Sequence, residues 1–226
     1  MASLCSEAWR KRKAEVAIRL VFRAVFLFSS AIRGLSEPLS SVAVPARRLN
    51  ILFICTANVC RSPLAAGLLA YNAKQAGLEV NIASASLDHE IRPTHATTTK
   101  LLAGRDITLV REQSQPLSDH LIDGADLVLV MTTEHAKGVV GRFPGSRRKV
   151  FLLSHLTGEL NAPEGIRTTA DWLQMIYARP RDYANNTKWD IPDPNNQPDS
   201  VYQAVDTLID NATAWLATVL AILPSD

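Results

Sequence analysis

Short apolar segments alternate with longer amphipathic ones along most of the chain. Residues 50–54 and 126–130 are largely apolar, which is typical of strands covered on both faces of a parallel sheet. Further strands are predicted at 78–85 and 150–153, and helices at 62–76, 93–103, 119–122, 133–140 and from residue 198 onward. Because strands alternate with helices, we predict one α/β domain of three layers, in which helices flank a four-stranded parallel sheet. Ligands bind such sheets at the carboxyl ends of the strands.

Glycines and an apolar stripe refine the predicted helices. Gly77 and Gly104 follow the helices at 62–76 and 93–103, where a C′ glycine is common. The last helix carries apolar side chains at a spacing of three to four residues, which predicts one face packed on the core and no cofactor site there. These positions are Val201, Val205, Leu208, Ala212, Trp215 and Val219.

Charge divides the chain near residue 48. Residues 1–48 hold nine Lys or Arg against three Glu, a net charge of +6, whereas the whole chain carries +2. Residues 49–226 therefore carry −4 and lack the basic surface expected of a nucleic-acid-binding domain. We predict a basic extension at 1–48, with a linker at 36–46, and a catalytic domain at 49–226.

The extension contains a stretch at 8–28 in which arginines recur at helical spacing among apolar residues, and this predicts a basic helix. Its longest uncharged run, at 24–32, has nine residues and is too short to span a bilayer. Three interpretations fit this pattern. They are a helix that lies on an anionic membrane surface, an organelle-targeting segment and an unstructured leader.

The candidate chemistry lies at 55–63, between the first predicted strand and the helix that follows it. Ser62 and Pro63 suit the N-cap and first position of that helix. Backbone N–H groups at a helix N-terminus lack intrahelical partners, and together with the helix dipole they bind anions. Arg61 adds a planar fork of donors that matches a phosphate, and the positive field favours the thiolate of Cys55. The segment therefore predicts a nucleophile in a phosphate-binding loop.

Five residues separate Cys55 from Arg61, and Ser62 follows the arginine. This is the spacing of the phosphate-binding loop in cysteine-dependent phosphatases. With Asn58 and Cys60 inside it, the loop resembles that of the low-molecular-weight protein tyrosine phosphatase family.

A second element far downstream strengthens the resemblance. Asp190-Ile191-Pro192-Asp193-Pro194 is similar to the loop that carries the general acid of that family. The segment at 125–131, His135, Phe143-Pro144 and the segment at 149–153 also resemble the family's middle section in order and spacing. The resemblance extends over about residues 49–223 and leaves the basic extension unexplained.

The resemblance implies a role for each site residue. Cys55 would attack phosphorus and form a phosphocysteine, while Arg61 and backbone N–H groups bind the equatorial oxygens. Asp193 would protonate the leaving group and then activate water. Neither a metal nor a cofactor is implied. The phosphate-binding set is Thr56, Ala57, Asn58, Val59, Cys60, Arg61 and Ser62.

Three loop residues have further expected roles. Ser62 would donate a hydrogen bond to the cysteine sulfur. Asn58 would hold the loop through its side chain and tolerate a left-handed conformation. Cys60 is close enough in sequence to be the redox partner of Cys55, in a reversible disulfide that shields the nucleophile from irreversible oxidation.

Departures from the family pattern bear on activity and specificity. Ala57 replaces a usual glycine, and a positive φ there would cost about 1 kcal/mol or more. Ser86 also replaces a glycine. Asn195 and Asn196 stand where tyrosine-directed members usually carry an aromatic beside the substrate ring. In contrast, Val59 matches the apolar residue of the tyrosine-directed branch, where the branch acting on phosphoarginine has threonine.

The expected activity is metal-independent hydrolysis of phosphotyrosine in protein. The alternatives are another phosphorylated residue or a small phosphate ester as substrate, a weakly active phosphate-binding module, and a relative of the thioredoxin-coupled arsenate reductases. The last is disfavoured because those enzymes relay through further cysteines, and the chain has none after Cys60. We therefore expect a phosphorylated protein or small ester as partner, no nucleic acid, and a peripheral membrane contact only through residues 8–28.

Cysteine and histidine content set the expected surroundings of the site. Three cysteines, two of them in one loop, do not form a disulfide framework, and a reactive Cys55 requires a reducing compartment, so a cytoplasmic location is expected. The five histidines lack ligand spacing, so no metal site is predicted. They are His89, His95, His120, His135 and His155.

An insert near 160–188 exceeds the length expected of compact family members. A helix is predicted at 171–177 and a loop at 179–183. We expect the aromatic side chains of the insert to pack against the domain rather than to contact substrate.

Overall fold

The computed structural model describes residues 48–159, 166, 168–179 and 187–223. The predictions for residues 1–47, including the basic helix at 8–28 and the linker, lie outside the described residues. The same holds for 160–165, 167 and 180–186 of the predicted insert. The described residues are therefore those of the predicted catalytic domain together with Arg48.

Four parallel strands form one sheet, as predicted, and their order is β2-β1-β3-β4. The strands are β1 (Leu49–Cys55), β2 (Val80–Ser86), β3 (Leu127–Val130) and β4 (Val150–Leu152). The chain passes from β1 to β2 and then returns to the opposite side of β1, so the strand order reverses beside β1. In the register, Cys55 is opposite Ser86, at the carboxyl ends of their strands. This reversal point is where open α/β sheets form a ligand crevice.

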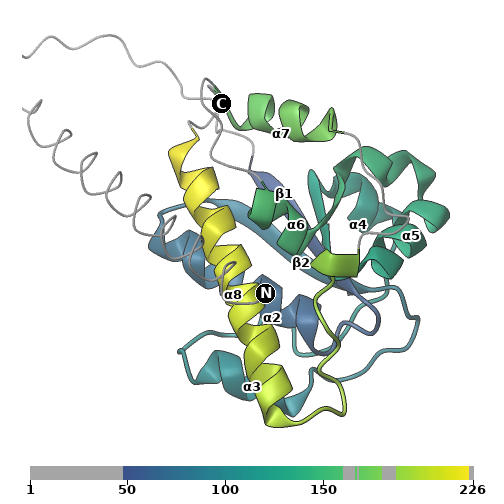
Figure 1. The fold of residues 1–226 in the computed structure, drawn as a ribbon, viewed down its shortest axis with the longest axis vertical. Helices are drawn as coiled ribbons and strands as arrows, with labels where there is room; N and C mark the ends of the chain where they lie inside the picture. Colours follow the sequence, from purple (N-terminus) through teal and green to yellow (C-terminus); the bar gives the residue numbers. More distant parts are fainter. Residues whose placement is uncertain (1–47, 160–165, 167, 180–186, 224–226) are drawn as a thin grey trace, which may run out of the picture. The chain divides into compact units, whose positions relative to one another are not determined.

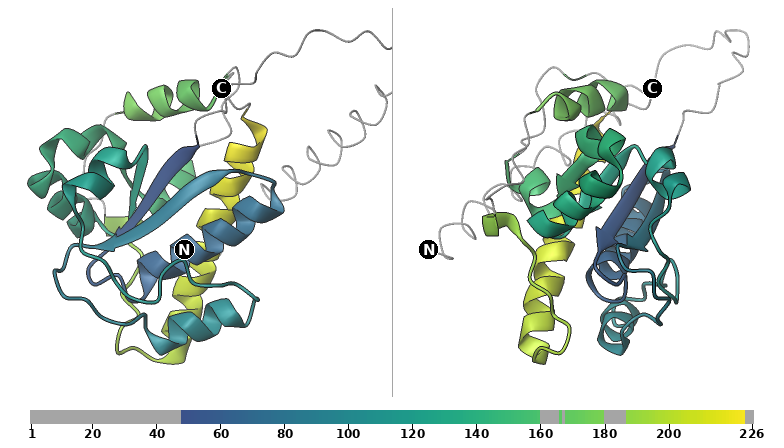
Figure 2. Two further views of the ribbon diagram at one scale, coloured as in Figure 1. Left: turned by 180° about the vertical axis from the view of Figure 1, so that it is seen from behind. Right: turned by 90° about the vertical axis from the view of Figure 1, so that its right-hand side faces the viewer.

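Each face of the sheet has its own core, because alternate strand residues point to opposite faces. Five of the described helices contribute to the first core: α2 (Arg61–Gln75), α3 (Ala96–Ala103), α6 (Leu153–Glu159), α7 (Thr169–Tyr177) and α8 (Asp199–Ile222). Two of the described helices contribute to the second core: α4 (Asp119–Gly124) and α5 (Thr133–Arg142). Ile51 and Phe53 belong to the first core, whereas Leu52 and Ile54 belong to the second. Figures 1 and 2 show helices on both sides of the sheet, which confirms the three layers.

The start of α2 differs from the prediction. Its N-cap is Cys60, which makes no side-chain cap, and Ser62 lies within the first turn. The serine does not cap the helix because its hydroxyl is engaged by Cys55 and Asn58. The other predicted elements are found with boundaries shifted by at most three residues.

Helix ends and connections also contain corrections. Gly77 has the predicted left-handed conformation, with φ of 68°, but Gly104 is the C-cap of α3, with φ of −63°. The first residue of α3 is Ala96, because His95 provides the N-cap by accepting from the Thr97 N–H. Three elements were not predicted from the sequence. They are α6 and the 3₁₀ helices η1 (Pro144–Lys149) and η2 (Thr187–Trp189).

The predicted core face of α8 is confirmed except at one position, since Val205, Ala212 and Val219 are buried and Val201 and Trp215 pack against the same core. Leu208, assigned to the core by its spacing, is 47% exposed, whereas Ile209 is fully buried. The reason is that α8 packs along α2, as Figure 1 shows, and the buried positions follow that contact. In the insert, Trp172 of α7 is fully buried, so the predicted packing role of this aromatic is confirmed.

Candidate active site

Cys55 is the last residue of β1 and lies where the strand order reverses. Its side chain is buried, and its Sγ lies 3.0 Å from Oγ of Ser62. The Asn58 side-chain amide donates to the same Oγ at 2.8 Å. Since the serine oxygen accepts from Asn58, its own hydrogen is free to point at the sulfur. A hydroxyl donor there stabilises negative charge on the nucleophile.

Most backbone carbonyls of the loop are paired, whereas its N–H donors are free. Four carbonyls accept from neighbouring N–H groups, whereas the N–H groups of residues 56–60 donate to no oxygen in the described part of the chain. Free N–H groups gathered at a helix N-terminus form an anion cradle. The bonds to the loop carbonyls are Leu87 N–H to Cys55 (3.1 Å), Asp88 to Thr56 (2.9 Å), His95 to Val59 (2.9 Å) and, in the first turn of α2, Leu64 to Cys60 (3.2 Å).

Asn58 supplies the turn of the loop. Its φ is 55°, in the left-handed region that asparagine tolerates. Its Oδ1 accepts from the Gln115 N–H at 3.1 Å, which ties the loop to a distant segment. Ala57 is not among the described residues with positive φ, so the strain considered for this alanine does not arise. The expected holding role of Asn58 agrees with these contacts.

Arg61 joins the loop to the predicted acid. The guanidinium is 4% exposed. Its Nη1 donates to the Ile191 carbonyl at 3.1 Å, and its Nη2 lies 2.8 Å from Oδ2 of Asp193. Its Nε has no acceptor among the described residues. A buried donor at the helix N-terminus, beside free backbone N–H groups, is suited to a phosphate oxygen.

The segment that carries Asp193 is anchored on both sides. Oδ1 of Asp190 accepts from the backbone N–H and the hydroxyl of Thr133, each at 2.7 Å. The Ile191 N–H donates to the carbonyl of Met131 at 2.8 Å. The Asp193 side chain itself is half exposed, with Oδ1 accepting from the Asn195 N–H at 3.1 Å. These contacts place a carboxylate at the mouth of the loop while leaving it accessible.

The segment that follows β2 contacts the loop, because the Asp88 N–H donates to the carbonyl of Thr56 at 2.9 Å. Ser86 donates from Oγ to the Asp88 carbonyl at 2.6 Å, so this serine fixes the segment next to the loop. Arg92 pairs with Asp88 at 3.2 Å and with Glu90. Ile91 is 66% exposed. The segment after β2 therefore carries paired charges and one exposed aliphatic side chain.

Cys60 lies behind the loop in a hydrogen-bonded chain. The Tyr202 hydroxyl is 3.5 Å from Cys60 Sγ and 3.1 Å from Nδ1 of His95, which also accepts from the Thr97 N–H at 3.3 Å. Because Nδ1 accepts, the tyrosine donates to it and its oxygen can accept from the thiol. Burial raises the pKa of Cys60, which agrees with a protonated thiol. Cys55 and Cys60 are both free thiols in the structure.

The sequence did not single out Gln115, His135 or Tyr202 as site residues. Each reaches the loop from a segment at least 57 residues away, through Asn58, Thr56 and Cys60 respectively. No local spacing signals such contacts, because they depend on how α5 and α8 pack around the sheet.

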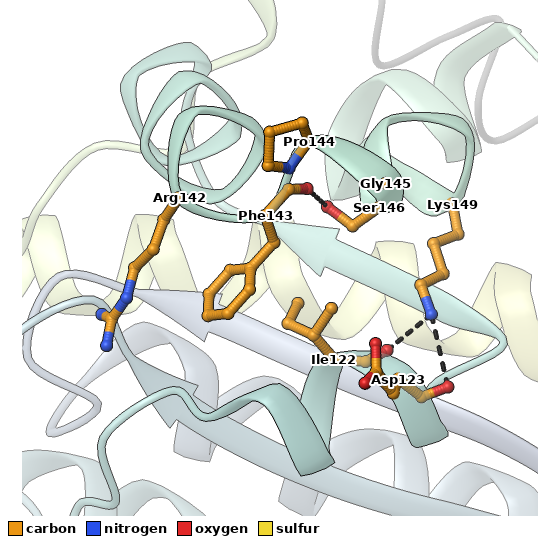
Figure 3. Close-up of a pocket in the computed structure, with 8 residues that line it drawn as sticks. All are labelled: Ile122, Asp123, Arg142, Phe143, Pro144, Gly145, Ser146 and Lys149. Carbon is orange, nitrogen blue, oxygen red and sulfur yellow. Dashed lines mark hydrogen bonds between the residues drawn. The ribbon is translucent and has the colours of Figure 1, made fainter.

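A separate pocket lies between α4 and η1, as Figure 3 shows, and shares no residue with the loop. Lys149 donates from Nζ to the carbonyls of Ile122 at 2.5 Å and Ala125 at 2.9 Å. Its ammonium therefore stabilises the C-terminal end of α4. Burial lowers the pKa of Lys149. Within the described ranges, no group of three or more His, Cys, Asp or Glu is arranged to hold a metal ion.

Comparison with known proteins gives consistent matches. The family described as low molecular weight phosphotyrosine protein phosphatase matches residues 50–166. A protein-arginine-phosphatase of Bacillus subtilis (strain 168) is 38% identical over 115 residues, which are 49% of this chain and 74% of that protein. The low molecular weight protein-tyrosine-phosphatase Wzb of Salmonella typhi is 29% identical over 129 residues, 57% of this chain and 84% of that protein.

A solved structure matches a larger share of the chain. The YwlE arginine phosphatase from Geobacillus stearothermophilus aligns with a TM-score of 0.57 and 29% identity, over 75% of this chain and 90% of that one. The fold and the position of the cysteine loop after the first strand agree with this likeness.

Proposed function

The chain belongs to the low molecular weight phosphotyrosine protein phosphatase family, and we propose that it hydrolyses phosphotyrosine in protein through a phosphocysteine formed on Cys55. The family makes it a metal-independent, cysteine-dependent phosphatase. The observation that carries the proposal is the 2.8 Å contact between Arg61 and Asp193. It joins an acid to the nucleophile loop from 132 residues away in the sequence.

The first step follows from the geometry of the loop. The thiolate of Cys55, stabilised by Ser62, attacks phosphorus in line with the leaving oxygen. Arg61 and the free N–H groups of residues 56–60 bind the equatorial phosphoryl oxygens, where charge accumulates in the transition state. Asp193 protonates the departing tyrosine oxygen, so the leaving group departs neutral.

The second step reuses the same groups. Asp193, now a carboxylate at the open mouth, removes a proton from water, which attacks the phosphocysteine. Cys55 leaves as a thiolate, and the Ser62 hydroxyl again stabilises its charge. Asp190 supports both steps because its bonds to Thr133 hold the acid segment in place.

Phosphoarginine in protein is a second candidate substrate. It is favoured by the likeness to the arginine phosphatases named above and by Asn195 and Asn196, which are exposed and supply no aromatic wall. Val59 favours phosphotyrosine. Peptides that carry either group, compared by kcat/KM, separate the two: a preference for phosphoarginine would overturn the first choice and leave the phosphocysteine step intact.

The activity itself is tested with p-nitrophenyl phosphate in the presence of chelator and reductant. We expect turnover by the wild type and none by Cys55→Ser. Turnover that depends on added metal, or that survives in Cys55→Ser, would contradict the mechanism.

We also propose that the enzyme works in the cytoplasm, because an active Cys55 requires a reducing compartment. Contact of residues 8–28 with an anionic membrane is likewise proposed from their basic, apolar sequence. A vesicle-binding measurement on the full chain and on a chain that begins at residue 48 would test the contact.

A further inference from the structure

Thr56, the residue after the nucleophile, makes one side-chain contact that the proposed mechanism does not use. Its Oγ1 lies 2.9 Å from Nε2 of His135 in α5, 79 residues away in the sequence. Thr56 is exposed at the loop, whereas His135 is only 6% exposed. The bond therefore joins a buried imidazole to an accessible hydroxyl beside Cys55.

The protonation of His135 fixes the direction of this bond. Burial, together with the positive charge of Arg61, lowers its pKa to about 4, so the ring is neutral near pH 7 and carries one N–H. Its Nδ1 has no partner among the described residues. A buried, unpartnered N–H is rarer in proteins than an unpartnered acceptor, so the hydrogen belongs on Nε2.

This bond direction determines the role of the Thr56 hydroxyl. Nε2–H of His135 donates to Oγ1 of Thr56, which is thereby the acceptor. The hydroxyl hydrogen of Thr56 then has no acceptor within the described part of the chain. It lies next to the free N–H groups of residues 56–60, in a loop whose other donors are suited to an anion.

We propose that Thr56 is a substrate-binding residue whose hydroxyl, oriented by His135, donates to a phosphoryl oxygen of the group held in the loop. His135 is the positioning residue. The inference rests on the proposed function, because it adds a side-chain donor to the same phosphate site.

The surroundings of His135 support a positioning role for this residue rather than a role in packing alone. Arg61 and Asp193 both act on its charge, so the imidazole lies near the phosphate-binding and acid groups. An exposed hydroxyl has no need of a protein partner, since water satisfies it. Burying an imidazole whose Nδ1 has no partner among the described residues costs free energy. We attribute this buried, partly unpaired ring to its role in orienting the Thr56 hydroxyl.

The test compares Thr56→Val, which removes the hydroxyl at constant shape, with Thr56→Ser, which keeps it. His135→Leu removes the ring donor, and His135→Gln keeps an N–H near Nε2. Two readouts are used: kcat/KM for p-nitrophenyl phosphate, and the affinity of inorganic phosphate measured by calorimetry, which needs no turnover. Thermal unfolding checks the fold of each variant.

We expect Thr56→Val to lower kcat/KM and phosphate affinity about tenfold, the magnitude of one hydrogen bond to a charged group. Thr56→Ser should recover most of this loss. His135→Leu should cause a similar loss, with no further loss in the Thr56→Val background, and His135→Gln should recover part of it.

Thr56→Val with the phosphate affinity of the wild type would overturn the proposal, as would fully additive losses in the double variant. If His135→Leu does not fold, the comparison of Thr56→Val with Thr56→Ser decides. A wild type without turnover that binds phosphate in the expected pattern would contradict the proposed enzyme but uphold this contact.

Discussion

The guanidinium of Arg61 and the carboxylate of Asp193 meet at 2.8 Å, although 132 residues separate them in the sequence. Arg61 is buried at the start of α2, whereas the Asp193 side chain is 51% exposed on the segment after η2. The arginine therefore links the phosphate-binding loop to the acid, and each is placed by a different part of the fold. Asp190 and Ile191 hold the acid segment on α5 and β3.

The acid role of Asp193 predicts a dependence on the leaving group. Asp193→Asn removes the proton donor but keeps the shape of the side chain. Because general acid catalysis contributes about 10²–10⁴-fold, hydrolysis of phenyl phosphate should fall by that order, while p-nitrophenyl phosphate, whose leaving group needs less protonation, should lose less. Equal losses in kcat for the two esters would remove Asp193 from the acid role.

Substitution should lower activity at Asn58 but leave it unchanged at Ala57. Asn58→Ala loses the bonds to Gln115 and Ser62 and places alanine at φ of 55°, whereas Asn58→Gly loses only the bonds. We expect both to lower kcat, and the alanine variant to be less stable than the glycine variant by about 1 kcal/mol in chemical denaturation. Ala57→Gly should bring no gain in activity. A large gain would show that the alanine strains the loop after all.

Cys60 should determine whether peroxide inactivation is reversible. Hydrogen peroxide converts the thiolate of Cys55 to a sulfenic acid, and the Cys60 thiol can displace water from it to form the disulfide. We expect dithiothreitol to restore most activity of the wild type but little of Cys60→Ser, whose nucleophile proceeds to irreversible acids. Recovery of the two proteins to the same extent would exclude Cys60 as the redox partner.

His135 should make the fold sensitive to acid. Its pKa falls from about 6.5 in the unfolded chain to about 4 in the fold, chiefly through burial, so between these values the unfolded state binds more protons. Stability should therefore be lost as pH falls from 6.5 to 4, by up to about 3 kcal/mol from this group. Chemical denaturation at several pH values measures the loss.

A matched histidine provides the control for that experiment. His135→Gln should flatten the pH dependence, whereas His120→Gln, at an exposed position of α4, should leave it unchanged. If the His135→Gln protein keeps the slope of the wild type, the buried imidazole is not its source.

The sheet and the loop could be predicted because local patterns encode them. The apolar runs of β1 and β3 are covered on both faces, and Cys55 and Arg61 belong to one short motif at a strand end. Asp193 was also identified from its own local motif. Its contact with Arg61, which brings it to the phosphate-binding loop, could be seen only in the folded chain.

Predictions from local sequence pattern failed where a residue makes a tertiary contact that the pattern does not show. Ser62 has the chemistry of an N-cap, but its hydroxyl contacts Cys55, so α2 begins one residue earlier. Leu208 has the spacing of a core residue, but the contact of α8 with α2 buries Ile209 instead. His135 was noted only as part of the resemblance in the middle section, and its contact with Thr56, 79 residues away, follows only from the folded chain. Tertiary packing decides these positions.

The phosphocysteine can be observed by mixing the enzyme rapidly with p-nitrophenyl phosphate, quenching in acid and measuring the mass of the peptide that contains Cys55. We expect one added phosphoryl group on that peptide, formed as fast as p-nitrophenol is released and absent from Cys55→Ser. Turnover without any phosphorylated Cys55 peptide, or a phosphoryl group on another residue, would contradict the mechanism at its first step.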